Sequence, residues 1–235
     1  MKKTKQRIWE IDALRGFLIL CVIAAHALFY LSQIRRAFAL PPTVAFVIRY
    51  GGMLFVVLSG LSATLGSRSF RRGLIVFAGG MVLTLGSLAA ASFGWIEETM
   101  VIRFGVLHLL GFVMMVYPLL KKLPSPVLLA FGLAVIVVGY WLELDDVLVR
   151  SHILFPLGLR YVGFSSGDYF PIAPHLGWFC LGVVLGRSLY AEKRTRLPDV
   201  NAELPILRFL RFCGQNSLWI FILHLPVLGG LLLLL

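Results

Sequence analysis

The chain has 235 residues, of which 59% are hydrophobic and only 14% are charged. A soluble globular domain carries about 25% charged and about 45–50% apolar residues, so this composition excludes a soluble fold. The formal net charge of +11 would fit nucleic-acid binding. The basic residues lie instead in short clusters between apolar blocks, where membrane-topology signals are found. We therefore expect an integral membrane protein that does not bind nucleic acid.

The apolar residues occur in seven long blocks, and about 20 such residues cross a bilayer core about 30 Å thick. The predicted spans are residues 12–33, 44–66, 73–92, 101–119, 126–143, 171–190 and 216–235. The basic start followed by an apolar block resembles a signal peptide, but the block is too long and no small-residue cleavage site follows it. We interpret it as the first permanent helix. The expected fold is all-α, a polytopic transmembrane helix bundle in one domain, 1–235.

The distribution of lysine and arginine indicates the orientation, because cytoplasmic loops carry an excess of both. One side of the membrane receives 15 basic residues, which are Lys2, Lys3, Lys5, Arg7, Arg68, Arg71, Arg72, Lys121, Lys122, Arg187, Lys193, Arg194, Arg196, Arg208 and Arg211. The other side receives six, which are Arg35, Arg36, Arg49, Arg103, Arg150 and Arg160. This asymmetry predicts a cytoplasmic N-terminus.

The first span contains the clearest polar residues. An ionisable side chain inside a span costs at least about 2.5–3.5 kcal/mol, so it needs a partner, a cavity or a function. Asp12 and Arg15 are three residues apart and are therefore neighbours on one helix face. His26 lies on the same face, about 16 Å beyond Arg15. The pattern indicates either a functional face or an interfacial Asp12–Arg15 pair with a hydrogen-bonded core histidine.

Other ionisable residues cluster at the predicted outer side. His108 is expected about two turns into the fourth span, at a depth comparable to His26, because the two spans run in opposite directions. The residues expected near this level are His26, Arg103, His108, Asp168, Tyr169 and His175. The sequence contains no HxxxH or HExxH spacing and no acidic residue deep in a span, so we predict no metal site.

His224 lies in the last span, two residues before Pro226. One interpretation is structural: the imidazole packs at a proline kink and bonds a carbonyl that the proline leaves without a partner. The other is a functional role. The residues leave both open.

Five sequence blocks together resemble a known family. They are residues 7–16 followed by His26, then 54–62, 103–111, 168–174 and 217–226. In this order they are similar to the bacterial relatives of heparan-α-glucosaminide N-acetyltransferase, over nearly the whole chain. The separation of Arg15 and His26 also matches the arginine–ten–histidine motif of the wider transmembrane acyltransferase superfamily.

The resemblance implies a membrane enzyme of the bacterial inner membrane that takes an acyl group from cytoplasmic acetyl-CoA or another acyl-CoA. The acceptor would be a hydroxyl or amine, such as that of a sugar or glycan, across the membrane. The resemblance suggests His26 as the catalytic histidine. Histidine suits the role of a base because the unperturbed pKa of an imidazole lies near working pH, and it could alternatively be acylated itself as a covalent relay. His108 would orient it or transfer a second proton.

The remaining roles are those that the resemblance implies for basic and polar residues at suitable positions. Arg15, Arg68, Arg71 and Arg72 would bind the coenzyme A phosphates, since arginine forks match phosphate geometry. The last three also fit a topology signal alone. The residues predicted to contact the acceptor are Arg103, Asp168, Tyr169 and His175. A proton-coupled transporter, using its histidines as a relay, and a non-catalytic membrane scaffold are the alternatives. Whether the protein forms a homo-oligomer is left open.

Overall fold

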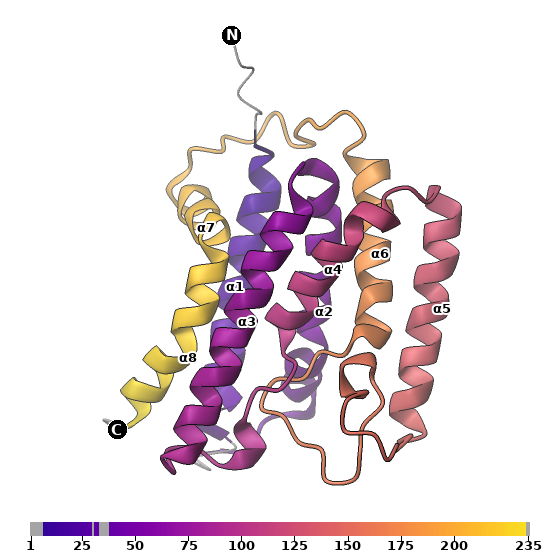
Figure 1. Ribbon diagram of the computed structural model, residues 1–235. Helices are drawn as coiled ribbons and strands as arrows, with labels where there is room; N and C mark the ends of the chain where they lie inside the picture. Colours follow the sequence, from indigo (N-terminus) through magenta and orange to yellow (C-terminus); the bar gives the residue numbers. More distant parts are fainter. Residues whose placement is uncertain (1–6, 30, 33–37, 234–235) are drawn as a thin grey trace. The chain divides into compact units, whose positions relative to one another are not determined.

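The computed structural model (Figure 1) describes residues 7–29, 31–32 and 38–233. Lys2, Lys3, Lys5, Arg35 and Arg36, used above to predict the orientation, lie outside these residues, as do parts of the predicted spans 12–33 and 216–235. The described chain is helical, and its extended segments pair only through isolated bridges, Phe104 with Tyr169 and Leu148 with Arg160. The prediction of an all-α fold is confirmed.

A helix stands at the place of every predicted span. The α-helices are α1 (Trp9–Phe29), α2 (Pro42–Leu65), α3 (Ser69–Ser92), α4 (Val106–Leu120), α5 (Ser125–Leu144), α6 (Ile172–Leu189), α7 (Pro205–Gln215) and α8 (Ser217–Leu233), with short 3-10 turns η2 (Glu98–Met100) and η3 (Phe155–Leu157). Five of them, α1, α2, α3, α5 and α6, are long and apolar enough to cross a bilayer, whereas α4 and α8 are apolar but shorter. The chain is therefore an integral membrane protein, and the count of seven spans stays a prediction.

The chain divides into two compact units, and the boundary falls inside α2. The first unit is formed by the described parts of Met1–Leu58 and Tyr190–Leu235. In it, α1 packs against α7 and α8. Gly16 and Gly214 allow the closest approach, because a Cβ atom at either would overlap the backbone of the facing helix. Small residues let membrane helices come this close.

The second unit, Ser59–Leu189, is built on two helix pairs, α3 with α4 and α5 with α6 (Figure 1). Gly111 brings α4 against the backbone of Phe77, and Gly177 brings α6 against α5. Arg187 is part of the scaffold, because its guanidinium donates to the carbonyls of Lys121 and Leu123 at 2.9 and 2.8 Å. These carbonyls lie at and just after the C-terminal end of α4, where no N–H group of the helix is available to bond them.

The structure corrects the predicted fourth span. Residues 101–105 are not helical, and α4 begins at Val106. His108 is therefore in the first turn of α4 rather than about two turns in. The reason is tertiary: Phe104 forms a bridge to Tyr169, and Gly167 donates its N–H to the carbonyl of Val101, so this segment is held extended by the loop before α6.

The amphipathic helix α7 was not predicted as a separate element. It is only 11 residues long, too short to cross a bilayer. Pro205 occupies its first turn, where a missing N–H costs nothing. Ile206, Phe209 and Phe212 are exposed on it. The sequence of α7 contains no long apolar block, because arginines interrupt its apolar residues.

Candidate functional site

Asp12 is the centre of a polar cluster in the first two turns of α1. Its carboxylate lies 3.4 Å from the guanidinium of Arg15 and 3.9 Å from that of Arg7. Gln215, at the end of α7, donates to the same carboxylate at 3.3 Å. The predicted contact between Asp12 and Arg15 on one helix face is confirmed. Gln215 is a partner that sequence spacing could not supply, because it comes from the other end of the chain.

His26 lies on α1 as a half-buried side chain. Its Nδ1 is 2.9 Å from the carbonyl oxygen of Val22, one turn earlier. A carbonyl can only accept, so Nδ1 carries the hydrogen. In the neutral ring Nε2 then has an available lone pair, which is the state that a general base needs.

The ring of His224 on α8 lies against the ring of His26 on α1. The two ring centroids are 4.8 Å apart, with an angle of 65° between the ring planes. Nδ1 of His224 lies 2.5 Å from the carbonyl oxygen of Phe221, so it is also the donor nitrogen. His224 is buried, and its Nε2 has no hydrogen-bond partner among the described residues.

His108, in the second unit, has the opposite arrangement. Its Nδ1 accepts the backbone N–H of Gly105 at 3.2 Å, so the hydrogen of the neutral ring is on Nε2. Nε2 lies 3.2 Å from the hydroxyl of Thr84, which donates in turn to the carbonyl of Ile102 at 2.7 Å. Both ring nitrogens are thus used. We call His108, Gly105, Thr84 and Ile102 the His108 network.

Asp168 joins the loop before α6 to the start of α4. Its carboxylate accepts the N–H of Val106 at 2.9 Å, so a negative charge caps the positive end of that helix. Ser166 donates its hydroxyl to the carbonyl of Asp168 and accepts the N–H of Arg103. Asp168 and His108 therefore meet at the N-terminus of α4, where each accepts a backbone N–H, from Val106 and from Gly105.

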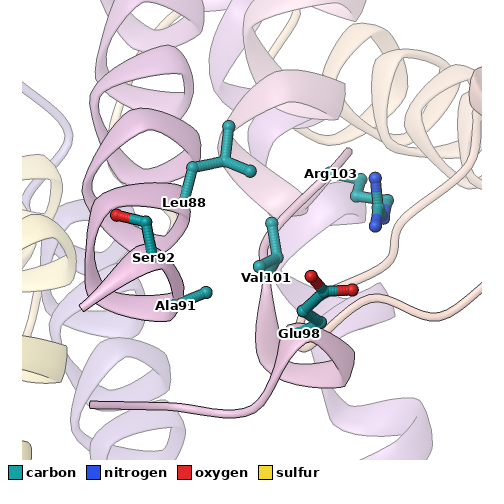
Figure 2. Close-up of a pocket in the computed structure, with 6 residues that line it drawn as sticks. All are labelled: Leu88, Ala91, Ser92, Glu98, Val101 and Arg103. Atoms are coloured by element: carbon teal, nitrogen blue, oxygen red, sulfur yellow. The ribbon is translucent and has the colours of Figure 1, made fainter. Parts of the chain in front are cut away.

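Arg103 lies beside this loop and lines a cavity. Its Nε donates to the carbonyl of Ser165 at 3.0 Å, which orients the guanidinium. Figure 2 shows the cavity between the end of α3 and the residues around η2. Its volume is about 240 Å³, and its lining residues are Leu88, Ala91, Ser92, Glu98, Val101 and Arg103.

Tyr169 and His175 are also tied to nearby backbone. The hydroxyl of Tyr169 donates to the carbonyl of Phe155 at 2.7 Å. Burial raises the pKa of Tyr169 far above its usual range, which keeps the hydroxyl a donor. His175 bonds the carbonyl of Pro171 through Nδ1 at 2.8 Å and packs on the ring of Phe170.

The three arginines at the start of α3 are solvent-exposed. Arg68 precedes the helix, and Arg71 and Arg72 lie in its first turn.

The residues predicted to form one site fall into different units. The first unit holds Asp12, Arg15, His26 and His224, and the second holds the remaining predicted residues. The convergence of the two sets on one site stays a prediction.

Sequence reasoning missed Thr84, Ser166 and Gln215. A threonine in the middle of the predicted third span was a usable signal, because a polar side chain there needs a partner. Ser166 and Gln215 carried no such signal, since both lie in polar segments. Within the described ranges, no three histidine, cysteine or acidic side chains gather as a metal-ligand set.

Comparison with known proteins identifies the family of the chain. No curated protein and no solved structure matches the chain. The family model described as heparan-alpha-glucosaminide N-acetyltransferase, catalytic, matches residues 7–226. This range holds every predicted site residue and nearly all of the chain. The chain belongs to the heparan-alpha-glucosaminide N-acetyltransferase catalytic family, a family of membrane acyltransferases.

Proposed function

We propose that this protein moves an acyl group, most simply acetyl, from cytoplasmic acyl-CoA to a hydroxyl or amine of a sugar-like acceptor. The acceptor lies at the outer side of a bacterial inner membrane. The family match and the apolar helices support a membrane acyltransferase. The observation that carries the chemistry is the state of His26, whose Nδ1 is anchored on Val22 and whose Nε2 lone pair is available.

His26 acts as the general base in this proposal. An oxygen or nitrogen of the acceptor attacks the acyl carbon with a lone pair, and Nε2 takes the proton that this O–H or N–H group loses. The carbon–sulfur bond of the thioester then breaks, and the coenzyme A thiolate leaves. A positioned base contributes about 10²–10⁴-fold to such a reaction.

The donor is held by arginines. Arg15 sits on the same helix as His26, and the carboxylate of Asp12 holds its guanidinium in place. A guanidinium presents a planar fork of N–H donors that matches the oxygen geometry of a phosphate. The exposed Arg68, Arg71 and Arg72 add positive charge for the coenzyme A phosphates.

The acceptor binds beside Arg103. Concave spaces with a few oriented polar groups are typical small-molecule sites. The cavity that Arg103 lines is of this kind, and its volume of about 240 Å³ is slightly below the usual range of about 300–1,000 Å³. Asp168 and Tyr169 shape the loop beside it, with His175 at the start of α6. His108 orients the segment through Gly105 and so acts as a positioning residue.

The test is acyl transfer by the purified protein in lipid vesicles with radiolabelled acetyl-CoA. Glucosamine and glucose serve as amine and hydroxyl acceptors, and free coenzyme A is measured alongside. His26→Asn removes the basic nitrogen and keeps an amide N–H for Val22, and it should lower kcat at least about 100-fold. His152→Asn, in an exposed loop residue, is the matched control.

Three results would contradict the proposal. Equal kcat in the wild type and His26→Asn would remove His26 from its role. Turnover that needs no acyl-CoA would remove the donor. Absence of turnover in the wild type, together with no rise of its melting temperature in acetyl-CoA, would reject acetyl-CoA as the co-substrate.

A further inference from the structure

Among the described residues, two buried side-chain polar atoms have no hydrogen-bond partner. They are Nε1 of Trp178, on α6, and Nε2 of His224, on α8. Buried polar groups are nearly always hydrogen-bonded, so each exception calls for an explanation. The ring that faces His224 is that of His26, at a ring-centroid distance of 4.8 Å.

The proline kink does not account for His224. Pro226 has no N–H and therefore leaves the carbonyl four residues earlier, that of Ile222, without its helical partner. His224 bonds the carbonyl of Phe221 instead. Even with that bond, the second ring nitrogen, Nε2, has no hydrogen-bond partner among the described residues.

The two histidines share one tautomer for the same reason. Each donates Nδ1–H to a backbone carbonyl on its own helix, Val22 for His26 and Phe221 for His224. In the neutral state both Nε2 atoms are acceptors, and neither can donate to the other. One additional proton changes this, because a protonated Nε2 is a donor and the other Nε2 is then its acceptor.

The distance between the rings is suitable for such a bond. A ring nitrogen lies about 1.1 Å from the centroid, so a nitrogen–nitrogen bond of about 2.9 Å joins rings at most about 5 Å apart. The observed separation of 4.8 Å falls within this limit, although Nε2 of His224 has no hydrogen-bond partner among the described residues, so the bond requires the two Nε2 atoms to turn toward each other. We propose that Nε2 of His224 accepts a hydrogen bond from Nε2–H of His26 once His26 has taken the proton of the acceptor.

This proposal rests on the proposed function, in which His26 is the base. The proton from the acceptor forms the bond to Nε2 of His26, the new N–H turns to Nε2 of His224 once the acceptor atom has bonded the acyl carbon, and the proton then leaves with the departing thiolate as the coenzyme A thiol. His224 is thus a positioning residue that stabilises the imidazolium of His26. A preorganised acceptor of this kind needs no rearrangement of solvent when the charge forms.

Other ionisable groups on the packed helices lie elsewhere. On α1, Glu10, Asp12 and Arg15 are near the opposite end, with Arg15 about 16 Å along the helix from His26. Cys21, also on α1, is exposed. On α7 they are Arg208 and Arg211, which pair with Glu203, and the buried Cys213. Among the described residues of α8, His224 alone titrates.

The first arm of the test needs no substrate. The protein is labelled with ¹⁵N-histidine, and nitrogen chemical shifts are recorded in nanodiscs as the pH is lowered. We expect the Nε2 signals of His26 and His224 to begin as unprotonated nitrogens and to change together, because one proton is shared. In His224→Asn, which keeps an amide donor for Phe221, the His26 signal should change alone and at a lower pH.

The second arm is the acyl-transfer assay. His224→Asn should lower kcat about 10–100-fold and leave the KM for acetyl-CoA unchanged, since His224 acts only through His26 in this proposal. The control, His152→Asn, removes an imidazole from an exposed residue outside the pair and should leave both constants unchanged. If His224→Asn does not fold, His224→Gln replaces it.

The outcomes separate the two proposals. Independent Nε2 signals in the wild type, or a His26 signal that does not respond to His224→Asn, would overturn the shared proton. Coupled signals with an unchanged kcat would overturn the positioning role. Coupled signals in a protein that transfers no acyl group and gains no thermal stability from acetyl-CoA would support the pair and reject the proposed function.

Discussion

The His26–His224 pair and the His108 network use the same residue type in opposite ways. In the pair, each Nδ1 faces a backbone carbonyl and must donate its hydrogen, so each Nε2 carries a lone pair in the neutral ring. In the network, Nδ1 faces a backbone N–H and must accept, so Nε2 carries the hydrogen and is bonded to Thr84. The backbone group beside a histidine thus decides its tautomer. The first arrangement leaves a base available, and the second holds a helix terminus together.

The comparison predicts that the two regions differ in what a mutation costs. His108→Ala should lower the free energy of unfolding by about 2–4 kcal/mol, because it leaves a cavity and an unpaired Gly105 N–H. His224→Asn should lower it by less than about 1 kcal/mol. Unfolding of both variants in detergent micelles measures the difference. Equal losses would show that the contrast between the two regions is wrong.

The contact of Gly80 with His108 offers a second way to sharpen the contrast. A Cβ atom at Gly80 would lie 2.9 Å from Nδ1 of His108, so Gly80→Ala should destabilise the protein by about 1–3 kcal/mol. Gly86, on the same helix, has open space around it. Gly86→Ala is the control and should be neutral or stabilising by up to about 1 kcal/mol. The same loss in both would contradict the packing of His108 on α3.

Thr84 tests the hydrogen bonds of the network alone. Thr84→Val keeps the shape of the side chain but removes the hydroxyl, and should cost about 1–2 kcal/mol in unfolding free energy. Thr84→Ser keeps the hydroxyl and should recover most of that loss. A valine variant as stable as the serine variant would show that Nε2 of His108 does not depend on Thr84.

Asp168→Asn is expected to have the smallest effect. The amide can still accept the N–H of Val106, but the charge at the helix N-terminus is lost, which is worth about 0.3–1 kcal/mol. The loss should appear locally, as faster hydrogen exchange in the first turn of α4. Exchange that increases equally in α5 would contradict a local role.

Much of the site could be predicted where it depends on one helix. The Asp12–Arg15 contact follows from the spacing of three residues, and the length of an apolar block determines a span. The position of His108 could not be predicted this way. Its segment reads as a continuation of the apolar block, and only pairing with the loop around Tyr169 holds residues 101–105 extended.

His224 shows a different limit. The sequence left a proline-kink role and a functional role open, because Pro226 is close by. The decisive facts were a carbonyl on the same helix, that of Phe221, and a histidine ring from α1. Neither can be read from spacing, since one depends on side-chain rotation and the other on helix packing.

The sequence by itself determined that this protein is membrane-embedded and helical and that its polar residues sit where a bilayer tolerates them only with partners. It also determined the family, through blocks spread along residues 7–226. Only the tertiary structure decided which histidine nitrogens are bonded and which are available. The physical reason is that hydropathy and helical period are properties of one segment, whereas a tautomer is set by the groups that other atoms of the fold bring within about 3 Å.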